Sequence, residues 1–199
     1  MAPQGRLITI EGIDGAGKTT LAEGIAAAWP GLTVLREPGG VVVSERIREL
    51  VKDPAVEVDP RAEALLYAAA RAQLVHERLL PLLEDGRDVL LDRFVDSSLA
   101  YQGAGRGLGV PEIAELNRFA TGGLVPDLTL LVRVEPAVGA RRAAGDDRLE
   151  QAGEAFFTAV AGAYDALAAA APDRIVVLDG ARAPADVLAS ALHAMKLLQ

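Results

Sequence analysis

The chain has 199 residues, a formal net charge of −8, 51% hydrophobic residues and no cysteine, and this length predicts one domain whose core forms without disulfides. The lack of cysteine excludes a disulfide framework and any cysteine-based metal site. The acidic balance argues against a general nucleic-acid binder. No apolar stretch approaches the ~20 residues of a membrane span, and none forms a signal peptide. We therefore expect a cytoplasmic protein without nucleic-acid or membrane partners.

Apolar runs and turn residues predict an alternation of strands and helices along the chain. In chain order, we expect a strand at 7–10, a helix at 18–29, a weaker strand at 32–35, helices at 42–52 and from about 60 to 83, a strand at 89–91, helices at 95–102 and 111–121, a strand at 128–132, a helix at 152–171, a strand at 175–178 and a helix at 183–196. The apolar runs do not alternate with polar residues, which indicates strands buried on both faces. The longest helix begins at Asp59-Pro60, an N-cap followed by proline at the first helical position. This pattern predicts an α/β fold in which a parallel sheet of five strands is flanked by helices.

A glycine-rich segment follows the first predicted strand directly. The residues with the spacing of a P-loop are Gly12, Gly17, Lys18 and Thr19. Backbone N–H groups of such a loop surround phosphates, and the next helix adds its positive N-terminal end. Lys18 then reaches the β- and γ-phosphates, and the Thr19 hydroxyl is placed to ligate Mg²⁺, so an incidental glycine-rich turn is the poorer explanation. The residues predicted to bind the nucleoside triphosphate are Gly12, Ile13, Asp14, Gly15, Ala16, Gly17, Lys18, Thr19 and Thr20.

Asp92 ends the predicted third strand, and Arg93 follows it. Ligands of open parallel sheets bind beyond the carboxyl ends of the strands, so both residues are candidates for the site, with Asp92 as a metal ligand. A surface Asp-Arg pair is the alternative. The sequence contains no Asn-Lys-x-Asp tetrad for guanine, which weakens a GTPase interpretation. The small size of the chain and a charged segment at 143–151 favour a nucleotide kinase with a closing lid.

Five motifs occur in an order that resembles the thymidylate kinase family. They are 11–20 (EGIDGAGKTT), 36–40 (REPGG), 92–103 (DRF and SSLAYQG), 126–129 (PDLT) and 147–150 (DRLE). The resemblance runs from Leu7 to about Leu178. It implies a three-layer α/β/α P-loop NTPase fold over residues 1–199 as a single kinase domain, with a lid at about 141–151. It also implies transfer of the γ-phosphoryl group of ATP to dTMP, giving dTDP and ADP for dTTP biosynthesis, with Mg²⁺ as cofactor and a homodimer as the assembly.

The resemblance assigns a set of residues to the acceptor nucleotide. They are Asp14, Arg36, Pro38, Tyr67, Arg71, Arg93, Ser98, Tyr101 and Gln102. Arg36 and Arg93 resemble arginines that hold the acceptor phosphate, because a guanidinium fork matches two phosphate oxygens. Tyr67 and Arg71, four residues apart on one helix face, resemble the aromatic that stacks on thymine and the arginine that bonds its O4. Core packing for Tyr67 and a solvated helix face for Arg71 remain as alternatives.

Two further acceptor residues are similar to family positions near the sugar. Asp14 resembles an aspartate between the 3′-hydroxyl and the metal region, and an Asx-type turn is its alternative. Tyr101 resembles the ring that fills the space beside C2′ and favours deoxyribose. Ser98 and Gln102 fall near the base and sugar in the same pattern.

The resemblance also implies the catalytic and metal-binding residues. The catalytic set is Lys18, Arg93, Arg142, Arg148 and Asp14, and the metal set is Thr19, Asp92 and Glu150. The family supplies an arginine for the transferred phosphoryl from the P-loop or the lid, and this P-loop holds no basic residue besides Lys18. We therefore expect Arg142 or Arg148 in that role and Arg141 against adenine, with a solvated helix end as the alternative for the Arg141-Arg142 pair. Glu150 resembles a lid acid that holds metal or orients the arginines.

Three residues depart from the family pattern, and two other functions compete with this interpretation. Val41 and Phe94 replace residues of other types, and Arg133 stands where an aspartate is common and has no explanation from the sequence. The first rival function is another small nucleotide kinase with a different acceptor. The second is a P-loop sensor that binds ATP without catalysis. Turnover of ATP that depends on dTMP separates all three.

Overall fold

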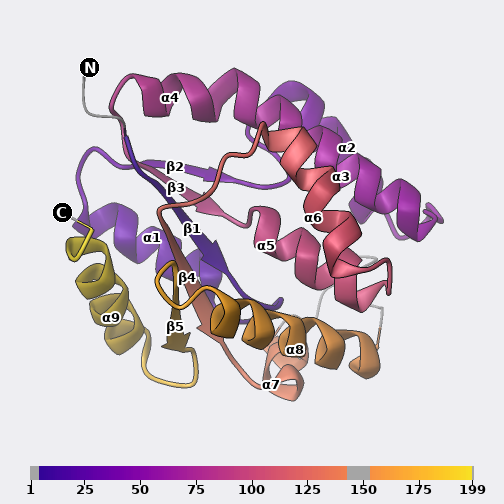
Figure 1. The fold of residues 1–199 in the computed structure, drawn as a ribbon. Coiled ribbons are helices and arrows are strands. Elements are labelled where there is room, and N and C mark those ends of the chain that lie inside the picture. The colour runs from indigo at the N-terminus through magenta and orange to yellow at the C-terminus, as the bar shows by residue number, and fades with distance from the viewer. Residues whose placement is uncertain (1–4, 143–152, 199) are drawn as a thin grey trace.

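The computed structural model describes residues 5–142 and 153–198, which form a three-layer α/β/α arrangement (Figure 1). The central sheet has five parallel strands in the order β2-β3-β1-β4-β5. The strands are β1 (Leu7–Glu11), β2 (Thr33–Arg36), β3 (Val89–Asp92), β4 (Leu128–Arg133) and β5 (Ile175–Asp179). Each predicted strand is present, including the weak second one, and the predicted fold class is confirmed.

Alternate residues of the strands pack against different helical layers, as the continuous apolar runs predict. On one side of the sheet, Ile8, Ile10 and Leu90 belong to a core cluster that contains residues of α1 (Lys18–Ala28) and α9 (Pro184–Lys196) and extends past the sheet to residues of α8 (Glu154–Ala170). On the other side, Leu7 and Val89 pack in a second core with residues of the long helical segment that begins at Pro60. Both faces of β1 are therefore buried, and its carboxyl end leads into the loop before α1.

The second helical layer is built from longer and less regular elements than the first. Its elements are α3 (Pro60–Leu74), the π-helical segment η1 (Val75–Leu79), α4 (Leu80–Glu84), α5 (Val95–Ser98), the π-helical segment η2 (Leu99–Gly105) and α8 (Glu154–Ala170). The helix predicted from 60 to 83 is thus one continuous course with a π-helical segment inside it. The helix predicted at 95–102 likewise passes into a π-helical segment and ends later than expected.

Two helices, α2 (Val42–Lys52) and α6 (Val110–Thr121), lie outside these layers, and one further helix, α7 (Pro136–Arg142), was not predicted from the sequence. α2 and α6 pack on α3, where Figure 1 shows them at the upper right. α7 follows β4 and has no counterpart among the predicted helices. Pro136 at its first position suits a helix start, since proline lacks the N–H that the first turn leaves unbonded.

Arg133, which the sequence left unexplained, forms an ion pair on the surface. Its Nε lies 2.8 Å from Oδ1 of Asp165 on α8, and both side chains are about half exposed. The pair joins the end of β4 to the second helical layer. In the described part of the chain, no helix is long and apolar enough to cross a bilayer.

Candidate active site

A cavity of about 880 Å³ lies at the carboxyl ends of β1, β2 and β3, where the fold predicts a ligand site. It brings together most of the residues that the sequence singled out. Those that line it are Asp14, Gly15, Gly17, Lys18, Thr19, Thr20, Arg36, Pro38, Tyr67, Arg71, Asp92, Arg93, Ser98, Tyr101, Gln102 and Arg142. Gly12, Ile13 and Ala16 are buried in the loop behind this surface, and Arg141 is exposed outside it.

The loop between β1 and α1 has the backbone geometry of an anion cradle. Gly12 has φ 138°, and a Cβ added there would lie 2.4 Å from the carbonyl oxygen of Val132, so only glycine fits. Gly17, also at positive φ, precedes α1, and no side chain caps the helix N-terminus. The Lys18 ammonium donates to the Ile13 carbonyl at 2.9 Å and lines the cavity. The first N–H groups of α1 and this ammonium suit a phosphate chain.

Asp92 and Thr19 form the part of the cavity that suits a hard cation. Oδ1 of Asp92 is buried and has no hydrogen-bond partner among the described residues. Thr19 is exposed at the start of α1 and lines the same cavity. Mg²⁺ at a nucleotide site is commonly held by one or two protein oxygens together with phosphates and water. The orphaned carboxylate oxygen therefore fits a magnesium ion beside the P-loop.

Arg93 links the P-loop to the segment that follows β3. Its guanidinium donates to the Gly12 carbonyl at 3.1 Å and to Ser97 Oγ at 3.0 Å. It pairs with Asp14 at 2.5 Å and lies over the ring of Tyr101, whose hydroxyl donates to Asp14 at 2.8 Å. Asp14 thus accepts hydrogen bonds from a guanidinium and a phenol of a distant segment, which a local Asx turn alone would not provide. Three predicted residues from two distant segments form one bonded group.

The charged residues around this group shift one another's pKa values. Burial opposes ionisation of Asp14, but the nearby positive charges of Arg93 and Lys18 outweigh it and lower the pKa of Asp14 to about 2. Burial, with the charge of Arg93, lowers the pKa of Lys18 to about 8, despite the acidic residues around it. A lysine so affected keeps its proton best when an anion lies beside it.

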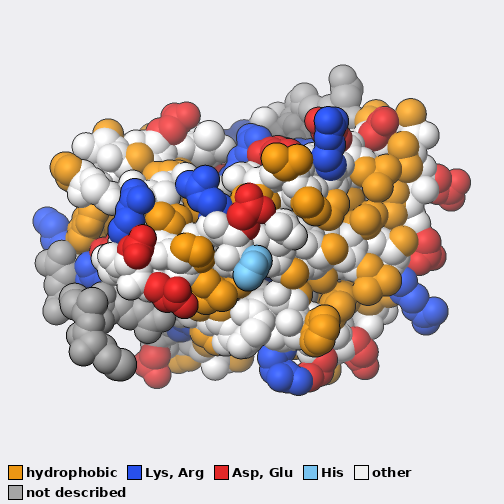
Figure 2. Space-filling model, turned by 90° about the horizontal axis from the view of Figure 1, so that it is seen from above, with side chains coloured by type: hydrophobic (Ala, Val, Ile, Leu, Met, Phe, Trp, Pro, Cys, Tyr) orange, Lys and Arg blue, Asp and Glu red, His pale blue; other side chains and the backbone are white. Residues whose placement is uncertain are grey.

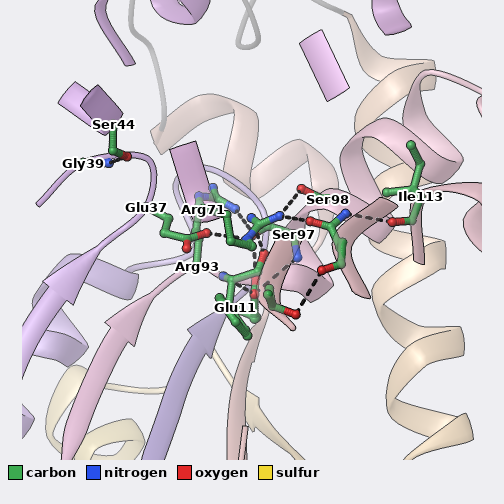
Figure 3. A network of polar contacts seen from close by, with 12 residues as sticks. Glu11, Glu37, Gly39, Ser44, Arg71, Arg93, Ser97, Ser98 and Ile113 are labelled. Carbon is green, nitrogen blue, oxygen red and sulfur yellow. Dashed lines mark hydrogen bonds and ion pairs between the residues drawn. The ribbon is translucent and has the colours of Figure 1, made fainter. Parts of the chain in front are cut away.

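Glu11 is a buried residue of the site that the sequence analysis included in a motif but gave no role. Its carboxylate accepts from the backbone N–H groups of Phe94 (2.7 Å) and Ser97 (3.2 Å) at the start of α5. It also accepts from the hydroxyls of Ser97 (2.6 Å) and Tyr164 (2.8 Å). These bonds fix the start of α5 against the end of β1 (Figure 3). A lone glutamate at a strand end gives no sequence signal for such long-range bonds.

Arg71 is one of the largest fully buried side chains of the protein, so the solvated-face alternative is wrong. Its Nε donates to Glu37 Oε2 at 2.7 Å, and Nη2 donates to the Phe94 carbonyl at 2.9 Å. Its Nη1 donates to Ser98 Oγ at 2.9 Å and to Oδ1 of Asn117. Figure 3 shows the guanidinium between Glu37 and Ser98. Helical periodicity placed Arg71 on a face with Tyr67 but could not reveal these partners.

The remaining acceptor residues surround the same end of the cavity. Tyr67 is half-buried, packs against the core and also lines the cavity. Gln102 is buried and donates to Glu63 at 2.9 Å. Arg36 is about half exposed and pairs with Glu45 at 3.2 Å. Pro38 follows Glu37 through a cis peptide bond and lines the cavity.

The predicted lid residues divide between described and undescribed parts of the chain. Arg142, the last residue of α7, lines the cavity and donates to the Gly180 carbonyl at 3.4 Å. Arg141 beside it is exposed. Arg148 and Glu150 lie outside the described residues.

Comparisons with known proteins agree with one another. The family model for thymidylate kinase matches residues 10–191. A thymidylate kinase of Deinococcus radiodurans is 51% identical over 198 residues, covering 96% of each chain, and one of Lactobacillus delbrueckii subsp. bulgaricus is 47% identical over 204 residues, covering 97% of this chain and 96% of its own. The crystal structure of thymidylate kinase from Ehrlichia chaffeensis is similar with a TM-score of 0.79 and 28% identity, covering 98% of this chain and 99% of its own.

Proposed function

The chain belongs to the thymidylate kinase family and is a phosphotransferase that uses ATP to convert dTMP to dTDP, and we propose that its cavity divides this reaction between a donor side at the P-loop and an acceptor side between β2, α3 and α5. The observation that carries this division is the group of Arg93, Asp14 and Tyr101, which joins the two sides within one cavity.

On the donor side, the P-loop residues 12–20 bind the phosphates of ATP, and Arg141 contacts adenine. Lys18 meets the β- and γ-phosphates, because its ammonium lies at the start of α1. Thr19 and Asp92, with Glu150 from the lid, would hold Mg²⁺, which would supply charge neutralisation for the phosphates of ATP.

On the acceptor side, Arg36 and Arg93 hold the phosphate of dTMP, and Asp14 accepts from its 3′-hydroxyl. Tyr101 closes the space beside C2′, and its ring is held by the cation of Arg93 at 5.0 Å. The other acceptor residues contact the base and sugar: Pro38, Tyr67, Arg71, Ser98 and Gln102. The burial of Arg71 supports a role in reading the base, because a donor shielded from water discriminates more strongly than an exposed one.

The transfer itself needs alignment and charge neutralisation rather than a general base. A phosphate monoester has a second pKa near ~6, so the acceptor oxygen is mostly unprotonated at neutral pH. Lys18, Arg93 and the lid arginines Arg142 and Arg148 stabilise the transferred phosphoryl, with the lid at about 141–151 as part of a single kinase domain. One such arginine contributes roughly 10³–10⁵ in rate in related enzymes.

An acceptor panel tests the proposed base recognition. ATP consumption is measured with dTMP, dUMP, dCMP and unphosphorylated nucleosides. We expect dUMP to be about 10–200-fold poorer than dTMP, because it lacks one methyl group in an apolar pocket. We expect dCMP to be far worse, because its amino group faces the donors of Arg71. Equal efficiency with dCMP and dTMP would contradict the assignment, and ATP binding without turnover would favour a sensor.

We further propose a homodimer that acts in the cytoplasm, where its nucleotide substrates occur. Large apolar side chains of the adjoining helices α2, α3 and α6 are exposed, among them Val42 (76%), Leu65 (57%) and Phe119 (86%). Figure 2 shows hydrophobic side chains gathered on one part of the face above these helices. Such a patch is typical of an interface. Light scattering should give twice the chain mass, and Phe119→Asp should shift the protein toward a monomer.

A further inference from the structure

The guanidinium of Arg71 has almost all of its hydrogen-bonding capacity committed within the protein. An arginine has five N–H donors in a rigid plane. Four of these N–H groups have partners among the described residues, supplied by Glu37, Phe94, Ser98 and Asn117. One N–H on Nη2 is left for a ligand. Because the four bonds run in different directions, the plane of the guanidinium cannot turn without breaking several of them.

Glu37 lines the cavity, and among the described residues its side chain has one hydrogen-bond partner, Arg71. Its Oε2 accepts from Nε of Arg71 at 2.7 Å, while Oε1 is buried without a hydrogen-bond partner in the described part of the chain. The two side chains are only 3% and 2% exposed. A buried ion pair contributes little net stability relative to apolar side chains of the same size. Orientation of Arg71 is therefore a better reason for this carboxylate than stability.

Asn117 holds the guanidinium from the side of α6. Its Nδ2 donates to the Ile113 carbonyl at 2.8 Å, one turn earlier on the same helix, and this bond fixes which way the amide faces. Its Oδ1 is then directed at Nη1 of Arg71. Asn117 is 1% exposed and does not line the cavity, so it reaches the ligand only through Arg71.

We propose that Glu37 and Asn117 are positioning residues that lock the guanidinium of Arg71 and thereby set the base selectivity of the acceptor site. The inference rests on the proposed function, in which Arg71 bonds O4 of thymine. A guanidinium that could rotate would turn its donor away from the amino group of cytosine and tolerate that base. A locked one keeps a donor facing a donor, and the wrong base is rejected.

Selectivity measurements on matched variants test the proposal. The variants are Glu37→Gln, Asn117→Leu and Asn117→Asp, which keeps an acceptor oxygen. The control is Asp96→Asn, which removes a different buried carboxylate. The Asp96 side chain pairs with Arg174 at 2.6 Å and, among the described residues, is hydrogen-bonded to none of the partners of Arg71. For each protein, kcat and KM are measured with dTMP, dUMP and dCMP, together with KM for ATP and Tm.

In Asn117→Leu, we expect the dTMP-to-dCMP ratio of kcat/KM to fall about tenfold or more, in line with loss of a hydrogen bond to a charged group. Glu37→Gln keeps an acceptor oxygen but removes the charge, so we expect a smaller fall of a few-fold. The dTMP-to-dUMP ratio should stay unchanged, because these bases differ only in a methyl group that Arg71 does not contact. KM for ATP should also stay unchanged, and Asn117→Asp should keep most of the selectivity. Asp96→Asn should lower Tm without changing either ratio.

An unchanged dTMP-to-dCMP ratio in folded Asn117→Leu would overturn the proposal, as would a parallel fall of both ratios. If Glu37→Gln does not fold, Asn117→Leu decides, and failure of both to fold would assign the residues to stability alone. Failure of the proposed function is separate, because it shows as no dTMP-dependent turnover by the unaltered protein. The affinity ratio for dTMP and dCMP from calorimetry then decides whether the two residues position Arg71.

Discussion

Arg71 and Arg142 both line the cavity, yet the protein holds them in very different ways. Arg71 is buried and bonded through four N–H groups to four residues of three segments. Arg142 ends a helix of 7 residues, and its one hydrogen bond to a described residue is a long bond of 3.4 Å to a backbone carbonyl. The guanidinium of Arg71, which the proposed function places at the base, is therefore held by contacts within the protein. Arg142, which the proposed function places at the transferred phosphoryl, has fewer such contacts among the described residues.

The largest expected effect is on the donor side, from Lys18→Ala. Turnover should fall by on the order of 10³-fold, because the lysine neutralises charge that develops on the transferred phosphoryl. The dissociation constant for dTMP should stay within about threefold, since the base end is bonded independently of Lys18. Steady-state kinetics and calorimetry give the two numbers. Loss of dTMP affinity in a folded variant would show that the two ends of the cavity are not independent.

A smaller effect is expected from the weakly held arginine. Arg142→Ala should lower kcat by about 10²-fold with little change in KM for dTMP, because the contact forms mainly in the transition state. Arg142→Lys should recover part of the loss, since it keeps the charge without the planar fork.

Alanine variants of Arg141 and Arg148 complete that series. Arg141 is exposed outside the cavity and is proposed to contact adenine, so its alanine variant should affect KM for ATP more than kcat. If all three alanine variants keep turnover within a few-fold of the parent, no lid arginine is catalytic, and Arg93 and the metal alone must neutralise the charge.

The smallest expected effect is the uptake of protons by the protein when ATP binds at the donor side. Burial and the charge of Arg93 lower the pKa of Lys18 to about 8, so the amine is partly neutral at pH 8 in the free protein. The phosphates of ATP favour the charged form and raise this pKa, so the unaltered protein should take up about half a proton more than Lys18→Arg at pH 8, and the difference should be almost zero at pH 6.5. Calorimetry of ATP binding in buffers of different ionisation enthalpy measures the uptake. Lys18→Arg is the reference because it stays charged, and an equal uptake in that variant would assign the proton elsewhere.

The parts of the molecule that the sequence predicted are those encoded within short segments. The strands are apolar runs because both of their faces are covered, and the loop at 12–20 carries its glycines at fixed spacing. The site residues were grouped by resemblance, and the structure gathers most of them around one cavity.

The parts that the sequence did not predict depend on residues far apart in the chain. Glu37 and Asn117 meet Arg71 across 34 and 46 positions, and Arg133 meets Asp165 across 32. Such pairs leave no periodic signal along the chain. The helix α7 was missed for a local reason, since its 7 residues are too few for an amphipathic period to stand out.

Arg93 carries a constraint of another kind. It is the one non-glycine residue with positive φ in the described ranges, at 70°, a conformation that costs an L-residue of order 1–3 kcal/mol. The backbone at this position would be most relaxed with glycine, whereas the side chain joins both sides of the cavity. A glycine at position 93 would relieve the backbone strain but would leave the largely buried carboxylate of Asp14 without its cation, which costs about 3–5 kcal/mol. The ion pair therefore outweighs the strain, and arginine at this position serves the stability of the fold as well as the site.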